Sequence, residues 1–66
     1  MVITEYRHYR GGVYELVCIA HLESDPETRM VVYQGADGTI WTRPEKIFFE
    51  QVEFEGRNVP SFALLG

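Results

Sequence analysis

The chain lacks several features that usually stabilise or target a small protein. Its 66 residues include one cysteine, Cys18, so no disulfide can form within the chain. Residues 1–5 lack a basic start followed by a long apolar run, so we expect no signal peptide. No stretch approaches the roughly 20 apolar residues of a membrane-spanning helix. These absences predict a cytoplasmic protein without a membrane partner.

Basic residues are also few. Ten acidic residues stand against six Lys and Arg, which gives a formal net charge of −4. This deficit removes the electrostatic basis for non-specific nucleic-acid binding. Three of the bases, Arg7, Arg10 and Arg43, lie beside aromatic residues in the sequence.

The residues that could bind a metal or act as nucleophiles do not have the sequence spacing of a known metal site or catalytic motif. His8 and His21 match no zinc signature with Cys18, and the acidic segment 23–27 lacks the glycine and the ligand periodicity of an EF-hand loop. Cys18 lies in the apolar run 16–20, and we expect it to be buried as a small hydrophobe, where a thiolate is disfavoured. We therefore expect no metal, no cofactor and no enzymatic activity.

Aromatic residues are abundant by contrast. The chain contains four Tyr, four Phe and one Trp. A domain of this size buries only about 60% of its unfolded surface, so its core needs large side chains. Each buried aromatic removes roughly 150–250 Å² from water, so a few of them can supply most of the core.

The first half of the chain is typical of β-strands. Residues 3–10 predict an extended segment that ends at Gly11 and Gly12, where the chain reverses. The longest predicted strand covers residues 13–22, and alternation places on its core face Tyr14, Leu16, Cys18, Ala20 and Leu22. Val17 and Ile19 then need cover, either from a bend in the strand or from a second subunit, and the second case would make the protein a homodimer.

Turn signals divide the rest of the chain. Residues 23–28 predict a polar connection, and residues 29–34 the next strand. The Asp-Gly pair within residues 35–38 favours a hairpin that returns through residues 39–43.

Pro44 then ends the returning strand and suits the start of one helical turn, which we expect to bury Ile47 or Phe48. Residues 49–54 predict a strand with Val52 and Phe54 inward, 55–58 a turn and 59–62 a short last strand. We expect residues 63–66 to fray, unless Leu64 or Leu65 covers an open end.

These elements add up to one domain over residues 1–66. We predict an all-β protein, a small SH3-like barrel of five or six short antiparallel strands with one helical turn after Pro44. An OB-like barrel is less well supported because it usually needs more residues.

The chain resembles a family of short bacterial proteins known as domain of unknown function 1653. The resemblance covers almost the whole chain and is carried by Tyr6-Arg7-His8-Tyr9-Arg10-Gly11, Tyr14, Val32-Tyr33, Gly38, Trp41-Thr42-Arg43-Pro44, Phe48 and Val59-Pro60-Ser61-Phe62. Ser61 departs from the family pattern, which has a basic residue there, and the loop before Gly38 is short. The resemblance implies an SH3-like barrel and no established activity.

Aromatic and arginine side chains form the candidate site. A shared surface of stacking and bidentate groups would suit a peptide, a nucleobase or a carboxylate. We predict that it includes Tyr6, His8, Tyr9, Arg10, Tyr33, Trp41 and Arg43. The expected function is a non-enzymatic binding or adaptor module for a peptide or protein, and the alternative is nucleic-acid or nucleotide binding by the same surface.

A competing interpretation assigns these residues to packing. A small domain needs its aromatic side chains for stability, so Tyr6, Tyr9 and Trp41 can belong to the core or its rim. Arg7 and Arg43 would then pair with nearby acids such as Glu5 and Glu50.

Overall fold

The computed structural model describes residues 4–66, so residue 3 of the first predicted strand lies outside the described part. Within this range the chain forms seven strands and one helical turn. They are, in order, β1 Thr4–His8, β2 Val13–Leu22, β3 Asp25–Gln34, β4 Ile40–Pro44, α1 Glu45–Phe48, β5 Gln51–Phe54, β6 Arg57–Pro60 and β7 Phe62–Leu64.

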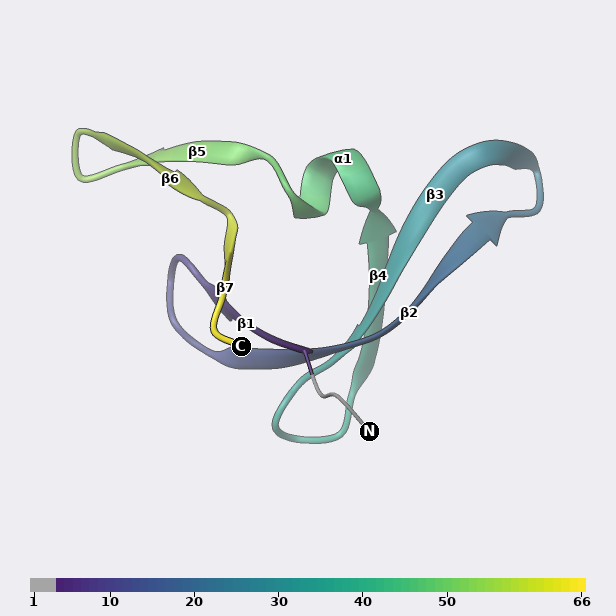
Figure 1. The fold of residues 1–66 in the computed structure, drawn as a ribbon, viewed down its shortest axis with the longest axis horizontal. Helices are drawn as coiled ribbons and strands as arrows, with labels where there is room; N and C mark the ends of the chain where they lie inside the picture. Colours follow the sequence, from purple (N-terminus) through teal and green to yellow (C-terminus); the bar gives the residue numbers. More distant parts are fainter. Residues whose placement is uncertain (1–3) are drawn as a thin grey trace.

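Five of the strands form one antiparallel sheet in the order β4-β3-β2-β1-β7, and β5 pairs with β6 in a separate hairpin. Figure 1 shows α1 lying over the sheet, with the β5–β6 hairpin and the β2–β3 hairpin extending to opposite sides. The prediction of an antiparallel all-β protein with a helical turn after Pro44 is confirmed. The predicted closed barrel is not formed, because β4 and β7 remain the two edges of an open sheet.

Glycine-rich turns connect the strands as the sequence predicts. Gly11 and Gly12 have φ angles of 104° and 86°, which side chains with a Cβ rarely adopt, and they reverse the chain between β1 and β2. In the β3–β4 turn, the amide of Gly38 donates to the carbonyl of Gly35 at 3.0 Å, and the amide of Thr39 donates to Oδ1 of Asp37 at 2.9 Å. The predicted Asp-Gly hairpin is therefore confirmed.

The β2–β3 hairpin differs from the prediction. Residues 23–28 are not a continuous connection, because the turn is confined to residues 23–24 and β3 begins at Asp25. The register then breaks between the pairs Leu22–Asp25 and His21–Arg29, and the Nδ1–H of His21 donates to the carbonyl of Pro26 at 2.7 Å. An irregular stretch of this kind accommodates a proline, which has no N–H to donate to the ladder.

A second irregularity lies at Val17 in β2. Leu16 pairs with Tyr33 and Cys18 with Val32, so Val17 is an extra residue in the ladder. A bulge reverses the alternation of side chains beyond it. After Leu16, the next side chain of β2 that packs against the core is therefore that of Ile19. The prediction of a buried Cys18 is therefore wrong, and its thiol is exposed.

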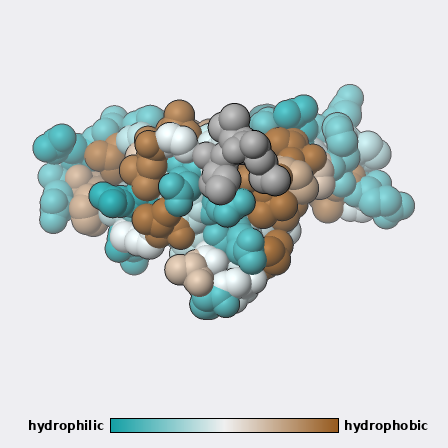
Figure 2. All heavy atoms as spheres, turned by 60° about the horizontal axis from the view of Figure 1, so that its bottom comes forward, coloured by the Kyte–Doolittle hydropathy of each residue, from teal (hydrophilic) through white to brown (hydrophobic). Residues whose placement is uncertain are grey.

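The bulge also changes the faces predicted for the end of β2. Ile19 packs against the core and needs no second subunit to cover it, whereas Leu22, which we predicted to face the core, is 39% exposed. Val17 remains 49% exposed. On the face drawn in Figure 2, hydrophobic groups lie in separate patches among hydrophilic ones.

The core is a small aromatic cluster. Its buried hydrophobic residues are Val31, Tyr33, Phe48 and Phe62, with Tyr6, Tyr14, Leu16 and Ile19 packed around them. The rings of Phe48 and Phe62 stack with centroids 4.2 Å apart and planes 7° from parallel. Phe48 rather than Ile47 is therefore the residue that the helical turn buries, since Ile47 is 42% exposed.

The C-terminal part is more ordered than the sequence predicted. The expected single strand over residues 59–62 is divided at Ser61, so that β6 belongs to the outer hairpin and β7 pairs with β1. The predicted fraying of residues 63–66 is wrong, because the amide of Leu65 donates to the carbonyl of Glu5 at 2.8 Å and the amide of Glu5 donates to the carbonyl of Gly66 at 2.9 Å.

The outer hairpin is only partly packed. Val52, predicted to face inward, is half-buried, whereas Phe54 is 38% exposed. Within residues 4–66, no helix has the length and apolar character needed to cross a membrane.

Phe48→Ala should destabilise the fold by about 3–5 kcal/mol, because it removes the buried ring against which four other aromatic rings pack. Urea unfolding followed by fluorescence measures the loss. Ile47→Ala, in the same helical turn but exposed, is the matched control and should cost much less. Equal losses for the two variants would contradict the central place assigned to Phe48.

Candidate binding groove

A groove of about 540 Å³ lies between the end of β1, the turn that follows it and the β5–β6 hairpin. One wall comes from β1 and its turn, and the other from the hairpin and β7. The residues that line it are Arg7, His8, Tyr9, Arg10, Gly11, Phe54, Val59, Pro60 and Ala63. The groove thus combines basic side chains on one wall with apolar surface on the other.

Tyr9 connects the two walls. Its ring meets that of Phe54 edge-on, with centroids 5.5 Å apart. Its amide donates to the carbonyl of Ser61 at 2.9 Å, and the amide of Ser61 donates to the carbonyl of Glu50 at 2.9 Å. Because these bonds satisfy the backbone of Ser61, which is 2% exposed, the junction between β6 and β7 is fixed beside Tyr9.

Arg10 is held against Tyr9. Its Nε–H donates to the hydroxyl of Tyr9 at 3.1 Å, and its guanidinium carbon lies 5.5 Å from the centre of the ring. The only ion pair within residues 4–66 joins Arg29 and Glu45. Neither Arg7 nor Arg10 is therefore paired with a carboxylate in the described part of the chain.

His8 links the groove to the core. Its ring lies 4.8 Å from that of Phe62 and 4.6 Å from that of Tyr9, measured between centroids. Burial lowers the pKa of His8 below its ordinary value of 6.5, and the positive charges of Arg43 and Arg10 lower it further. The amide of Arg10 donates to Nδ1 of His8 at 3.2 Å, which assigns the proton of the neutral ring to Nε2.

Arg43 lies on the core side of His8. Its Nε–H donates to the hydroxyl of Tyr33 at 3.1 Å, and its guanidinium carbon is 5.3 Å from the centre of the Phe62 ring. The ion pairs of the packing interpretation, Arg7 with Glu5 and Arg43 with Glu50, are not formed within residues 4–66. Arg43 instead satisfies the hydroxyl of a tyrosine that is only 5% exposed.

The remaining predicted site residues lie elsewhere. Tyr6 packs edge-on against Phe48 and Phe49, with centroids 5.3 and 5.9 Å away. Trp41 is 51% exposed, and it lies on β4, which β3 and β2 separate from β1. Of the predicted site residues, the structure brings His8, Tyr9 and Arg10 together in the groove. Arg43 contacts Tyr33, which belongs to the core, and Trp41 lies on a different surface.

The sequence did not identify the second wall. Phe54, Val59, Pro60 and Ala63 were absent from the predicted site, as was Arg7 on the first wall. The Val-Pro motif and the alternation that pointed Phe54 inward were available signals. They could not show which strand these side chains would face.

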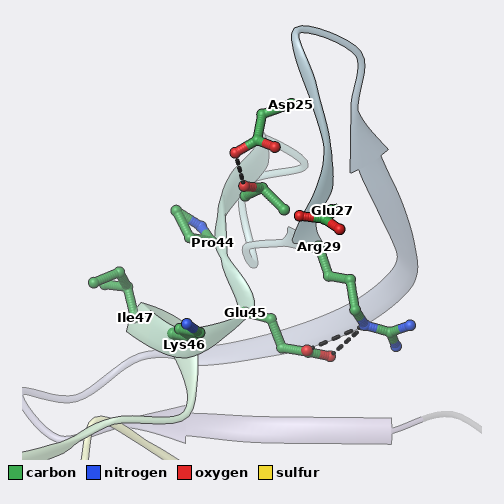
Figure 3. A pocket seen from close by; sticks show the side chains of 8 residues that line it. Asp25, Glu27, Arg29, Pro44, Glu45, Lys46 and Ile47 are labelled. Atoms are coloured by element: carbon green, nitrogen blue, oxygen red, sulfur yellow. Dashed lines mark hydrogen bonds and ion pairs between the residues drawn. The ribbon is translucent and has the colours of Figure 1, made fainter.

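A second hollow of about 580 Å³ lies between β3 and α1. Figure 3 shows Asp25 and Glu27 on β3 and, across from them, Lys46 and Ile47 on α1. Within this hollow, the hydroxyl of Thr28 donates to Asp25 at 2.7 Å, and Nε of Arg29 lies 3.1 Å from Oε1 of Glu45. No group of three or more metal-ligating side chains occurs in residues 4–66.

The comparisons with known proteins identify a family. A family described as "Protein of unknown function (DUF1653)" matches residues 4–64. The chain belongs to this family. The match includes both walls of the groove and every residue of the predicted site. No curated protein and no solved structure matches this DUF1653 chain.

Arg43→Gln should destabilise the protein by about 1–2 kcal/mol, because it removes a hydrogen bond to a buried hydroxyl and a cation–π contact. A double-mutant cycle with Tyr33→Phe, measured by urea unfolding, should give a coupling energy of about 0.5–1.5 kcal/mol. Arg57→Gln, at an exposed position in β6, is the control and should change stability little. A coupling energy indistinguishable from zero would show that the contact does not stabilise the fold.

Stability should fall as the pH is lowered below about 6.5, because the unfolded chain then takes up a proton on His8 more readily than the folded protein does. His8→Gln should remove this part of the pH dependence, whereas His21→Gln should retain it. Urea midpoints between pH 5 and 8 measure the effect. In an NMR titration, Arg43→Gln should raise the pKa of His8, and an unchanged pKa would refute the electrostatic link between the two residues.

Proposed function

We propose that this protein is a non-enzymatic binding module that holds a peptide segment of another protein in the groove beside Tyr9. The observation that carries the proposal is the groove itself, which joins apolar surface from Phe54, Val59 and Pro60 to donor groups of Arg7 and Arg10. Ligand sites typically combine an apolar lining with a few polar groups that fix orientation.

The chemistry of the lining favours binding over catalysis. Guanidinium groups remain protonated at neutral pH, so Arg7 and Arg10 can donate hydrogen bonds but cannot act as a general base. His8 is the one groove residue with a basic lone pair, and the amide of Arg10 already occupies its Nδ1. The polar groups of the groove are therefore suited to hold a ligand in place.

The order of elements supports a peptide ligand by analogy. A hairpin, a helical turn and further short strands follow one another as in SH3-like domains, whose aromatic grooves bind extended peptides. The open sheet of this chain differs from a closed SH3-like barrel, so the analogy concerns the succession of elements alone. The exposed thiol of Cys18 fits a reducing compartment, and we propose the cytoplasm as the place of action.

Nucleic-acid binding is the second candidate. The exposed Trp41 and the guanidinium of Arg10 beside Tyr9 are groups on which bases can stack. The net charge of −4 opposes it, and the hairpin that forms one wall carries the exposed acids Glu53 and Glu55. A peptide ligand is therefore the preferred proposal.

Selection from a displayed random-peptide library tests the proposal. Peptides enriched on the wild-type protein should lose at least about tenfold in affinity on Ala63→Leu, which fills the groove from β7. The matched control Ala36→Leu makes the same change in the β3–β4 turn and should bind normally. NMR spectra should first show that both variants remain folded.

Two results would contradict the groove as the binding site. Equal affinities of the enriched peptides for wild type and Ala63→Leu would exclude it. Loss of binding on Trp41→Ala with full binding to Ala63→Leu would assign the function to the surface around Trp41 instead.

A further inference from the structure

The two arginines of the groove have no anionic partner within the described chain. Arg7 lies on β1 and Arg10 in the turn that follows, and the single ion pair of residues 4–66 involves neither. Both arginines are exposed, in a chain with ten acidic residues against six basic ones. The groove also has no Asp or Glu in its lining. It is therefore a local basic site on an acidic protein.

Arg10 is already oriented for an anion. Its Nε–H donates to the hydroxyl of Tyr9, and its guanidinium carbon lies over that ring, 5.5 Å from the centre, so two contacts hold the group in place. The two terminal NH₂ groups have no recorded acceptor among the hydrogen bonds of residues 4–66 and can form the two parallel bonds that a carboxylate accepts. Holding the group in advance lowers the entropy lost on binding.

Apolar surface lies next to this charge. Phe54 is 38% exposed, and Val59 and Pro60 continue the same wall along β6. A simple inorganic anion would leave that wall uncovered, whereas an aliphatic or aromatic side chain would bury it. The groove is complementary to a ligand that carries both a negative charge and an apolar group.

The charge pattern around the groove also favours a ligand with only one or two negative charges. Beyond the groove the β5–β6 hairpin presents the exposed acids Glu53 and Glu55, so a long polyanion that followed the groove outward would meet like charge. One or two carboxylates confined to the basic wall avoid this repulsion. The charge pattern thus favours an acidic peptide over a nucleic-acid strand.

From this complementarity we propose that the groove selects peptide segments in which an acidic residue lies beside an aromatic or aliphatic one. Arg7 and Arg10 bind the carboxylate, and the wall formed by Phe54, Val59 and Pro60 takes the apolar side chain. This specificity rests on the proposed function and adds to it the chemical class of the partner.

Fluorescence polarisation with three labelled, end-blocked peptides tests the selectivity. All have the same central Phe-Leu pair, which is flanked by Asp and Glu in the first peptide, by their amides Asn and Gln in the second, and by Lys in the third. The acidic peptide should bind at least about tenfold more tightly than the amide peptide at low salt, and this advantage should shrink as salt is added.

Matched variants locate the effect. Arg10→Gln and Arg7→Gln should each reduce binding of the acidic peptide several-fold while leaving that of the amide peptide nearly unchanged. Arg57→Gln removes an equal charge from β6 outside the groove lining and should have little effect. Thermal melting of each variant separates a loss of binding from a loss of folding.

The outcomes distinguish the two proposals. Equal binding of the acidic and amide peptides, with both lost on Ala63→Leu, would overturn the acidic selectivity and leave the groove as a peptide site. An acidic preference that survives both arginine variants would also overturn it. Tighter binding of an oligothymidylate, displaced by the acidic peptide, would overturn the inference in favour of nucleic acid. Failure of every library peptide to enrich would overturn the proposed function itself.

Discussion

The stacking of Phe48 on Phe62 is the contact on which the other packing depends. These rings belong to α1 and β7, two segments that are not hydrogen-bonded neighbours, and their centroids lie 4.2 Å apart. Tyr33 completes the cluster from the sheet, with centroids 5.3 and 5.4 Å from the two rings. Because residues 4–66 contain few other buried side chains, this cluster supplies most of what fixes α1 over the sheet.

The same cluster positions the candidate groove. The buried ring of Phe62 contacts both Arg43 and His8, and His8 lines the groove, so the core adjoins the groove through this contact. Arg43 is partly buried against Tyr33 and Phe62 and does not line the groove. Burial lowers the pKa of His8, and the positive charges of Arg43 and Arg10 lower it further. The positive charges available to a ligand in the groove are therefore those of Arg7 and Arg10.

Short sequence patterns predicted those features that depend on a few neighbouring residues. The Gly-Gly and Asp-Gly turns and the helical turn after Pro44 follow from backbone preferences, whereas the sequence left the buried residue of that turn open between Ile47 and Phe48. The bulge at Val17 could not be predicted, because nothing in residues 13–22 marks which residue leaves the ladder, and one extra residue moves Cys18 to the outer face. The division of the predicted last strand at Ser61 could not be predicted either. Residues before Ser61 pair with β5 and residues after it pair with β1, and the local sequence does not specify these partners.

The site was predictable only where its residues are neighbours in the chain. His8, Tyr9 and Arg10 were identified together because they occupy consecutive positions, whereas Phe54, Val59 and Ala63 come close through the order of the strands. The open sheet itself makes the groove possible. A closed barrel has no free sheet edges, whereas here β5 and β6 pair only with each other and supply one wall of the groove. In this chain the bend at Ser61 lets the hairpin leave the sheet, while the hydrogen bond from the amide of Tyr9 to the carbonyl of Ser61 holds the junction beside β1. The departure from the predicted barrel and the existence of the candidate site therefore have the same structural cause.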